Sequence, residues 1–281
     1  GRALSGAPSD DTVDGADAGS ARAFVRTGTS WSEEATLAAS DGAATDRFGT
    51  SVALLADGSL ALVGAPEDDI VALADAGTAR TFLWAASRWV EGPALVASGG
   101  SAAEFFGYSV ALSSDGGRAL VGATRADRPG AVDAGNARVF FRTGTGWVEE
   151  ATLVAGGGAG GDNFGSAVAL SGDGSRALVS ASRADTAGGD SGCAYVFLRT
   201  GTVWVEETRL VASDGAAGDL FGSSVALSAA GTHALLGAQD DTTMGRSTAG
   251  SAYVFFRSGT TWTEEAQLVA SDGDAGDQLG A

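Results

Sequence analysis

The chain has 281 residues, and its 35 acidic residues outnumber 17 arginines, with no lysine, so the formal net charge at pH 7 is −18. This charge argues against nucleic acid as a partner, because phosphate binding needs a basic surface. No apolar stretch approaches the ~20 residues of a membrane span, and the single cysteine excludes an intrachain disulfide framework.

One unit is repeated five times along the chain. A tryptophan recurs at positions 31, 89, 147, 204 and 262, and a Phe-Gly pair begins at positions 48, 106, 164 and 221, with Leu279-Gly280 in its place in the last copy. A fixed period of tens of residues is typical of a repeat architecture. The sequence therefore predicts a single array over residues 1–281, with repeats at approximately 1–47, 48–105, 106–163, 164–220 and 221–281.

The third copy shows most clearly how one repeat is expected to fold. Residues 108–113 alternate apolar and small side chains, as in a half-buried strand, and Asp115-Gly116 then signals a tight hairpin. Residues 118–123, 136–143 and 147–154 predict three further strands, rich in apolar, β-branched and aromatic side chains. Four antiparallel strands per unit of about 58 residues predict an all-β fold, in which each repeat is a blade of a β-propeller.

The first copy begins at its second strand, residues 2–8, and so lacks the innermost strand of its blade. The sequence leaves open whether the chain is a segment of a longer array or another molecule supplies that strand. A ring of five blades is geometrically possible. Paired glutamates on the fourth strand, such as Glu149-Glu150, are expected to protect an exposed sheet edge. The periodic tryptophans are expected to be packing residues rather than a row of sugar-binding rings.

Acidic residues concentrate in two kinds of loop. In an up-and-down blade, the loops from strand two to three and from strand four to the next blade emerge on one face, and they hold 23 acidic residues and five arginines, which account for the whole net charge. One interpretation is that aspartate simply suits turns. The other is that this face binds a divalent cation or a basic partner.

Calcium is the cation considered for the acidic face, because it takes about six to eight oxygen ligands. The densest acidic stretches are residues 9–17 and 66–69, although neither has the spacing of an EF-hand loop. The candidate metal ligands there are Asp10, Asp11, Asp14, Asp17, Glu67, Asp68 and Asp69. The candidate partner-binding residues are Asp240, Asp241 and Trp84, the last of which stands where other copies have arginine.

Four segments carry a resemblance to a known family: DLFGSSVALS (219–228), ALVGAPEDD (61–69), AGSAYVFFRSGTTW (249–262) and LVASDGAAGDLFG (210–222). They resemble the FG-GAP repeat in its bacterial form, over the whole chain. The resemblance implies a propeller, commonly of seven blades, in extracellular adhesion or recognition proteins such as integrin α subunits. Integrin-type repeats often carry a calcium loop between strands one and two, but the corresponding connections are short here, as in residues 54–62.

Residues for catalysis are scarce in this sequence. His233 is the only histidine and is expected at the surface, so a histidine-dependent triad or a multi-histidine zinc site has too little to work with. We expect a non-catalytic module, secreted by a bacterium and extracellular or at the cell surface, that presents its acidic loop face for adhesion or scaffolding. Its partner would be a protein, a glycan or another copy of itself. The alternatives are a surface or filament subunit assembled by strand donation between chains, and an accessory propeller of a larger secreted enzyme.

Overall fold

The computed structural model describes residues 1–144, 146–243 and 245–281, and their regular structure consists of β-strands. The strands form five antiparallel sheets, each in simple chain order. The first two sheets contain β1 (Arg2–Ala7), β2 (Ser20–Thr27) and β3 (Ser30–Leu37), then β4 (Ser51–Leu54), β5 (Leu60–Ala65), β6 (Thr78–Ala85) and β7 (Arg88–Leu95). The third contains β8 (Phe106–Leu112), β9 (Arg118–Ala123), β10 (Asn136–Thr143) and β11 (Gly146–Leu153). The last two contain β12 (Phe164–Leu170), β13 (Arg176–Ala181), β14 (Cys193–Thr200) and β15 (Val203–Leu210), then β16 (Phe221–Leu227), β17 (His233–Ala238), β18 (Ser251–Ser258) and β19 (Thr261–Leu268).

The predicted strands of the third repeat are confirmed. β9 and β10 span 118–123 and 136–143, as expected from the sequence, and β11 covers 146–153. The first strand begins two residues earlier than predicted, because Phe106 of the Phe-Gly pair is already paired with Ala123 of β9. The first sheet has three strands and begins with the equivalent of strand two, as predicted.

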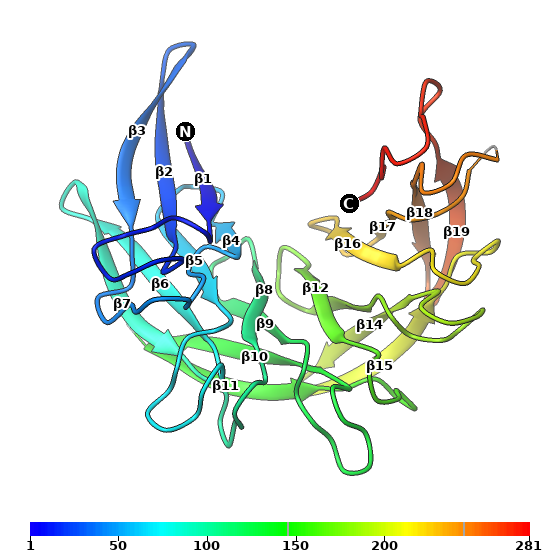
Figure 1. The fold of residues 1–281 in the computed structure, drawn as a ribbon, viewed down its shortest axis with the longest axis horizontal. Helices are drawn as coiled ribbons and strands as arrows, with labels where there is room; N and C mark the ends of the chain where they lie inside the picture. Colours follow the sequence, from blue (N-terminus) through cyan, green and yellow to red (C-terminus); the bar gives the residue numbers. More distant parts are fainter. Residues whose placement is uncertain (145, 244) are drawn as a thin grey trace.

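The sheets follow one another along an arc, like the blades of a propeller (Figure 1). The first strand of each complete sheet lies on the inner side of the arc, and the fourth strand lies on the outer side. The first and last sheets lie at the two ends of the arc, on either side of an opening, so these five blades do not form a closed ring. Within the described residues, no helix has the length and apolar character to cross a membrane.

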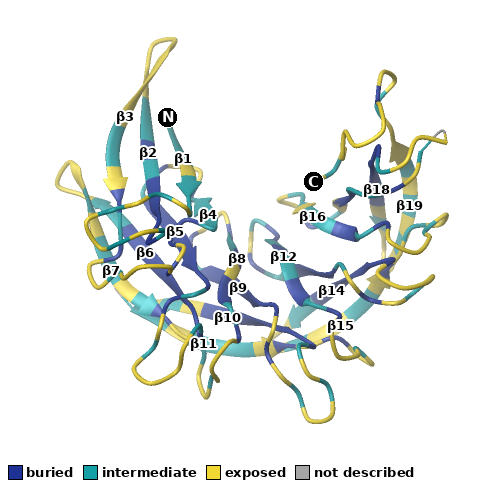
Figure 2. Ribbon diagram, viewed as in Figure 1, coloured by how far each residue is buried: buried dark blue, intermediate teal, exposed yellow. Residues whose placement is uncertain are grey.

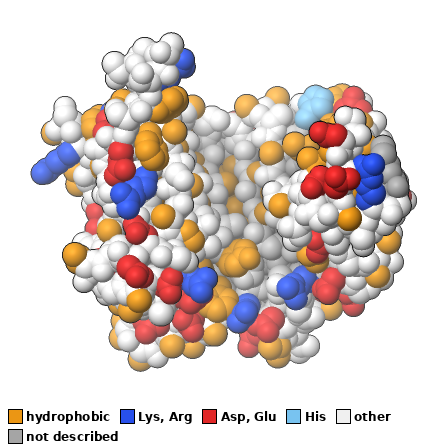
Figure 3. All heavy atoms as spheres, turned by 45° about the horizontal axis from the view of Figure 1, so that its top comes forward, with side chains coloured by type: hydrophobic (Ala, Val, Ile, Leu, Met, Phe, Trp, Pro, Cys, Tyr) orange, Lys and Arg blue, Asp and Glu red, His pale blue; other side chains and the backbone are white. Residues whose placement is uncertain are grey.

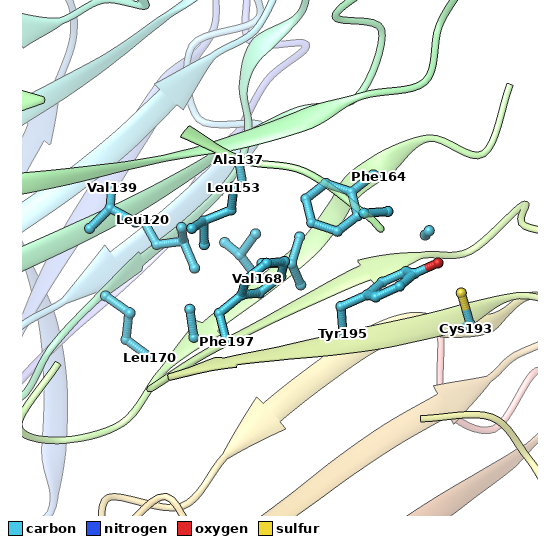
Figure 4. Close-up of a cluster of buried hydrophobic side chains, with 14 of the residues drawn as sticks. Leu120, Ala137, Val139, Leu153, Phe164, Val168, Leu170, Cys193, Tyr195 and Phe197 are labelled. Atoms are coloured by element: carbon cyan, nitrogen blue, oxygen red, sulfur yellow. The ribbon is translucent and has the colours of Figure 1, made fainter. Parts of the chain in front are cut away.

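The core lies between neighbouring blades. The second strand of each central blade is buried along most of its length, whereas loops and hairpins are exposed (Figure 2). Figure 4 shows Phe164 and Phe197 of the fourth blade beside Leu120 and Val139 of the third. Burying such side chains contributes about 1.5–3 kcal/mol each, so a blade is stabilised mainly through its neighbours.

Cys193 is fully buried in the same cluster, and burial raises the pKa of its thiol to about 11. A thiol with so high a pKa is largely protonated at neutral pH and therefore unreactive.

The Phe-Gly pair is fixed by two separate requirements. The phenylalanine is buried in every intact copy, as at Phe106, whose ring lies edge-on to Phe140. The glycine has a positive φ, 97° at Gly107, and a Cβ there would lie 2.2 Å from the carbonyl oxygen of Thr78. Only glycine meets both the backbone conformation and the close approach.

A serine hydroxyl connects successive blades at the start of the first strand. Ser109 Oγ donates a hydrogen bond of 2.8 Å to the carbonyl oxygen of Gly165 in the next blade. Gly122 leaves room for this contact, because a Cβ there would lie 2.1 Å from that oxygen and 2.4 Å from Ser109 Oγ. In the fourth blade the serine stands at the other of the two positions: Ala167 replaces the serine and Ser180 replaces the glycine.

The strand-four glutamates bind neighbouring blades, which differs from the edge protection expected from the sequence. Glu150 accepts hydrogen bonds from Arg118 of its own blade (3.0 Å to Nε), and from Arg199 (2.6 Å to Nη2) and Trp204 (3.4 Å to Nε1) of the next. Burial alone would raise the pKa of Glu150, but these bonds outweigh burial and hold the pKa below its ordinary value. We call this arrangement the glutamate lock.

A β-bulge places the glutamate of the lock. In the third blade, Phe140 pairs with Glu149 and Val139 pairs with Ala151, which leaves Glu150 as the extra residue. Bulges commonly redirect a side chain in this way. Glu149 accepts the backbone N–H of Ser98 in the preceding blade at 2.8 Å, so the pair contacts the blades on both sides.

The glutamate lock recurs in two other blades, whereas in the second blade both the glutamate and the arginine of the same blade are replaced. Glu207 is bonded by Arg176, Arg257 and Trp262, and Glu34 by Arg2 and Trp89. In the second blade, Leu60 stands at the arginine position and Gly92 at the glutamate position. The interpretation of the tryptophans as packing residues holds for four of them, which pack against buried clusters: Trp89, Trp147, Trp204 and Trp262. Trp31 differs, since it is 51% exposed.

Candidate ligand-binding pocket

The repeats differ most from one another on either side of the Phe-Gly pair. The residue before the pair is Arg47, Phe105, Asn163, Leu220 or Gln278, and the residue after it is Thr50, Tyr108, Ser166, Ser223 or Ala281. Strands two and three change far less between copies. Side chains at these two positions therefore differ from blade to blade, in contrast to the nearly constant second and third strands.

The residue before each pair adopts a left-handed backbone conformation. Its φ lies between 53° and 55° in all five copies, although none is glycine and Phe105 and Leu220 are bulky. Such a conformation costs free energy and persists only where the surrounding structure imposes it. At Phe105 the N–H donates to the carbonyl of Asp75 and the carbonyl accepts the N–H of Tyr108, so both of its peptide groups are held.

Four of these turns, those at residues 47–50, 105–108, 163–166 and 220–223, line a pocket of about 530 Å³ at the inner edges of the blades. The residues that follow the second strands complete its wall: Pro8, Pro66, Glu67, Thr124, Arg125, Ser182, Arg183 and Gln239. Figure 3 shows the hollow between the two ends of the arc, with arginine and acidic side chains along its border. A volume of this size is in the usual range of small-molecule sites.

Three arginines give the pocket a positive character. Arg47 is paired with Glu67 at 3.0 Å, and the guanidinium carbon of Arg125 lies 4.4 Å from the ring centroid of Phe105. Arg183 is exposed, and within the described chain neither Arg125 nor Arg183 forms an ion pair. Two guanidinium groups are therefore free to bind an anion.

The acidic loops lie together around the pocket, as the up-and-down topology predicts. The loop after the first blade's second strand is bonded to the loop after its fourth strand through Thr45 N–H and the carbonyl of Ala16, at 2.9 Å. Both kinds of loop also supply residues of the pocket wall. The pocket therefore opens on the face that carries most of the negative charge.

The carboxylates predicted as metal ligands mainly hold the loops in shape. Asp10 accepts hydrogen bonds from Ser20 and Arg22, which lower its pKa. Asp68 accepts them in the same way from Thr78, at 2.6 Å, and Arg80, at 3.1 Å.

The remaining candidates are also dispersed. Asp11 and Asp69 accept the backbone N–H groups of Asp17 and Asp75, Glu67 pairs with Arg47, and Asp14 contacts Thr12. In the described part of the chain, no three histidine, cysteine or acidic residues form a group that could hold a metal ion. The calcium site therefore stays a prediction.

The candidate partner-binding residues are not brought together. Asp240 accepts a hydrogen bond from Gln278 and follows the pocket residue Gln239. Asp241 is buried and accepts hydrogen bonds from Ser251 and Tyr253. Trp84 is half-buried, with the guanidinium carbon of Arg2 3.9 Å from its ring centroid. Only Asp240 lies next to the pocket.

Four residues of the pocket were not predicted from the sequence: Phe105, Tyr108, Arg125 and Arg183. The signal that marks them is divergence between aligned repeats: copies that otherwise agree differ at these positions. A repeat protein supplies this comparison within one chain.

One buried acid near the pocket is expected to make stability depend on pH. Asp46 is 5% exposed, and burial raises its pKa to about 6, despite a hydrogen bond from Ala43 N–H. Asp46→Asn keeps an acceptor and removes the buried charge, so at pH 8 it should raise the free energy of unfolding by about 1–3 kcal/mol.

The benefit of Asp46→Asn should vanish at low pH. A raised pKa favours the native state below the ordinary value of 3.8, and this contribution is lost as the pH rises through about 6. Urea unfolding at pH 8 and at pH 4 measures the difference between the two proteins. An equal gain at both values, or a loss at pH 8, would contradict this origin of the shift.

Comparisons with known proteins address the family and the fold. The sequence profile of the FG-GAP repeat matches residues 31–82, 89–140, 147–197 and 204–255. No curated protein sequence matches the chain.

Two solved structures resemble this one. A functionally unknown protein from Desulfotomaculum acetoxidans has a TM-score of 0.58 and 11% identity, over 97% of this chain and 69% of its own. The periplasmic gluconolactonase of Pseudomonas aeruginosa has a TM-score of 0.56 and 16% identity, over 91% of this chain and 65% of its own. At such identities the likeness concerns the fold alone.

Proposed function

Since this chain belongs to the FG-GAP repeat family, whose profile matches it four times between residues 31 and 255, we propose that it is a non-catalytic, extracellular interaction module. The ligand, a protein or a glycan, binds in the pocket at the inner edges of the blades. The acidic loops around the pocket form the rest of the contact surface.

The observation that carries this proposal is the divergence of the repeats at the pocket. Residues that pack the blades recur because every interface between blades makes the same demands. Residues at the pocket do not take part in this packing, so they can differ between copies. They do differ in size, charge and polarity from blade to blade. Four copies supply different side chains to the pocket wall, and such an uneven surface suits recognition of one asymmetric ligand.

The chemistry of the pocket wall supports binding rather than catalysis. Among its described residues there is neither histidine nor cysteine, and its one carboxylate, Glu67, is paired with Arg47. General acid–base or nucleophilic catalysis needs a proton-transferring group within reach of a second functional group. The wall offers hydroxyl, amide, aromatic and guanidinium groups instead.

An array of extracellular glycans and matrix proteins tests this function. The labelled protein should be retained by a component of the array, and mass spectrometry should recover that component unchanged. Tyr108→Ala should abolish retention, because Tyr108 is 45% exposed in the pocket.

Trp31→Ala is the matched control, since Trp31 is 51% exposed on β3, outside the pocket wall. Retention that Tyr108→Ala leaves intact would refute the proposed site. A complete lack of retention, or chemical turnover of the retained component, would refute the function.

A further inference from the structure

We infer that the pocket recognises a sugar acid, a saccharide ring that bears a single carboxylate. This inference rests on the proposed function, because it takes the pocket to be the ligand site. It follows from three properties of the wall: two free guanidinium groups, several neutral polar groups, and an exposed aromatic ring.

The carboxylate is expected to bind between Arg125 and Arg183. A guanidinium group presents paired N–H donors that match the two oxygens of a carboxylate. The guanidinium carbon of Arg125 lies over the ring of Phe105, and Arg125 forms no ion pair among the described residues, so its N–H groups are left for a ligand. Arg47 is already neutralised by Glu67, so it does not compete for the same anion.

The sugar hydroxyls are expected to meet the neutral polar side chains of the wall. These are Thr50, Thr124, Asn163, Ser166, Ser182, Ser223 and Gln239. Hydroxyl and amide groups both donate and accept hydrogen bonds, as sugar hydroxyls do. The hydroxyls of Thr50 and Ser223 already donate to the carbonyls of Arg47 and Gly280, and that of Ser166 is bonded to Ser180 Oγ. The groups expected to bind the sugar hydroxyls are therefore those of Thr124, Asn163, Ser182 and Gln239.

Tyr108 supplies a surface for the apolar face of the sugar ring. Its side chain is 45% exposed and projects from the turn that also carries Phe105. A tyrosine offers a rigid apolar ring with a polar tip, which suits a ligand that is apolar on its faces and polar at its edge.

The acidic face restricts how much charge the ligand can carry. Most of the net charge of −18 lies in the loops around the pocket, and like charges repel. The acidic loops would repel a polyanionic chain strongly, whereas a compact ligand with one carboxylate would reach the arginines with little repulsion. A cationic ligand would be attracted by the acidic loops but repelled by the arginines inside the pocket.

Calorimetric or NMR titration with D-glucuronate, D-glucose and acetate tests the inference. Glucuronate should bind, while glucose, which lacks the carboxylate, and acetate, which lacks the ring, should bind at least tenfold more weakly. Arg125→Ala and Arg183→Ala should each weaken glucuronate binding by about 10- to 100-fold. Tyr108→Ala should weaken it by about tenfold.

Arg88→Ala is the matched control, because Arg88 is an exposed arginine of β7 outside the pocket wall. It should leave glucuronate binding unchanged. Methyl β-D-glucuronide distinguishes the two sources of this chemistry: equal binding indicates the end of a glycan, and loss of binding indicates a free sugar acid.

Three results would overturn the inference. Acetate binding as tightly as glucuronate would show recognition of an anion alone, and glucose binding equally well would remove the role of the carboxylate. Absence of glucuronate binding at tens of millimolar would reject the sugar acid. In that last case, retention on the array that Tyr108→Ala abolishes would still support the proposed function, so the two failures are distinguishable.

Discussion

Glu150→Ala is expected to lower the free energy of unfolding by about 3–5 kcal/mol, because it breaks a buried ion-pair network by removing one partner. The side chain of Glu150 is 11% exposed, and so is that of Arg118. Without the carboxylate, Arg118, Arg199 and the N–H of Trp204 would remain at the interface between blades without their acceptor. Urea unfolding at pH 7 measures the loss.

Two variants separate the glutamate lock from a general effect of removing charge. Glu265→Ala removes the same residue of the repeat in the last blade, where it is exposed and forms no ion pair among the described residues, and should change stability by less than about 0.5 kcal/mol. Glu150→Gly with Arg118→Leu copies the second blade, which has Leu60 and Gly92, and should be less destabilising than Glu150→Gly alone. Equal losses for Glu150→Ala and Glu265→Ala would refute the lock.

The effect of Glu150→Ala should also depend on pH. Because the pKa of Glu150 is lowered in the folded protein, its contribution is complete above the ordinary value of 4.5 and is lost as the pH falls through the folded value. The gap between wild type and variant should therefore narrow below about pH 4.5.

Gly122→Ser is expected to destabilise the protein by about 3 kcal/mol or more, since overpacking of a close contact is costly. The added Cβ would lie 2.1 Å from the carbonyl oxygen of Gly165. That oxygen belongs to the backbone of the next blade, so relief requires the two blades to separate locally. Thermal or urea unfolding of the single variant measures the cost.

A second substitution should restore part of this stability. Ser109→Ala removes the hydroxyl that a Cβ at Gly122 would approach to 2.4 Å. The fourth blade already has this combination, and there Ser180 Oγ accepts the N–H of Ala167 at 2.9 Å. Gly122→Ser with Ser109→Ala should therefore recover about half of the loss, and a double variant no more stable than Gly122→Ser would contradict this compensation.

The strands could be predicted because their determinants are local. Residues 118–123 and 136–143 combine apolar or β-branched runs with turn residues at both ends, and β9 and β10 match them. The repeat period then predicted the blade, and segments such as residues 219–228 carried the resemblance to the family. Arrangement of the blades along an open arc depends on contacts between blades, which no single repeat encodes.

The role of the glutamates could not be predicted because it depends on a bulge and on a neighbouring blade. Read as an ordinary strand, residues 147–154 place Glu149 and Glu150 on opposite faces, whereas the bulge makes Glu150 the extra residue. The pocket was missed for a related reason. Arg125 and Tyr108 lie 17 residues apart in sequence, and only the inner edges of the blades bring such positions to one cavity.

The left-handed backbone conformation of the residue before each Phe-Gly pair has a consequence for how this protein could acquire new specificities. Its conformation is imposed by backbone bonds, as at Phe105, and the five copies already tolerate arginine, phenylalanine, asparagine, leucine and glutamine at that position. Mutation there can alter what is bound without disturbing how the blades assemble. A combinatorial library at these few sites would thus explore many binding preferences on one unchanged framework, as hypervariable loops do on an antibody.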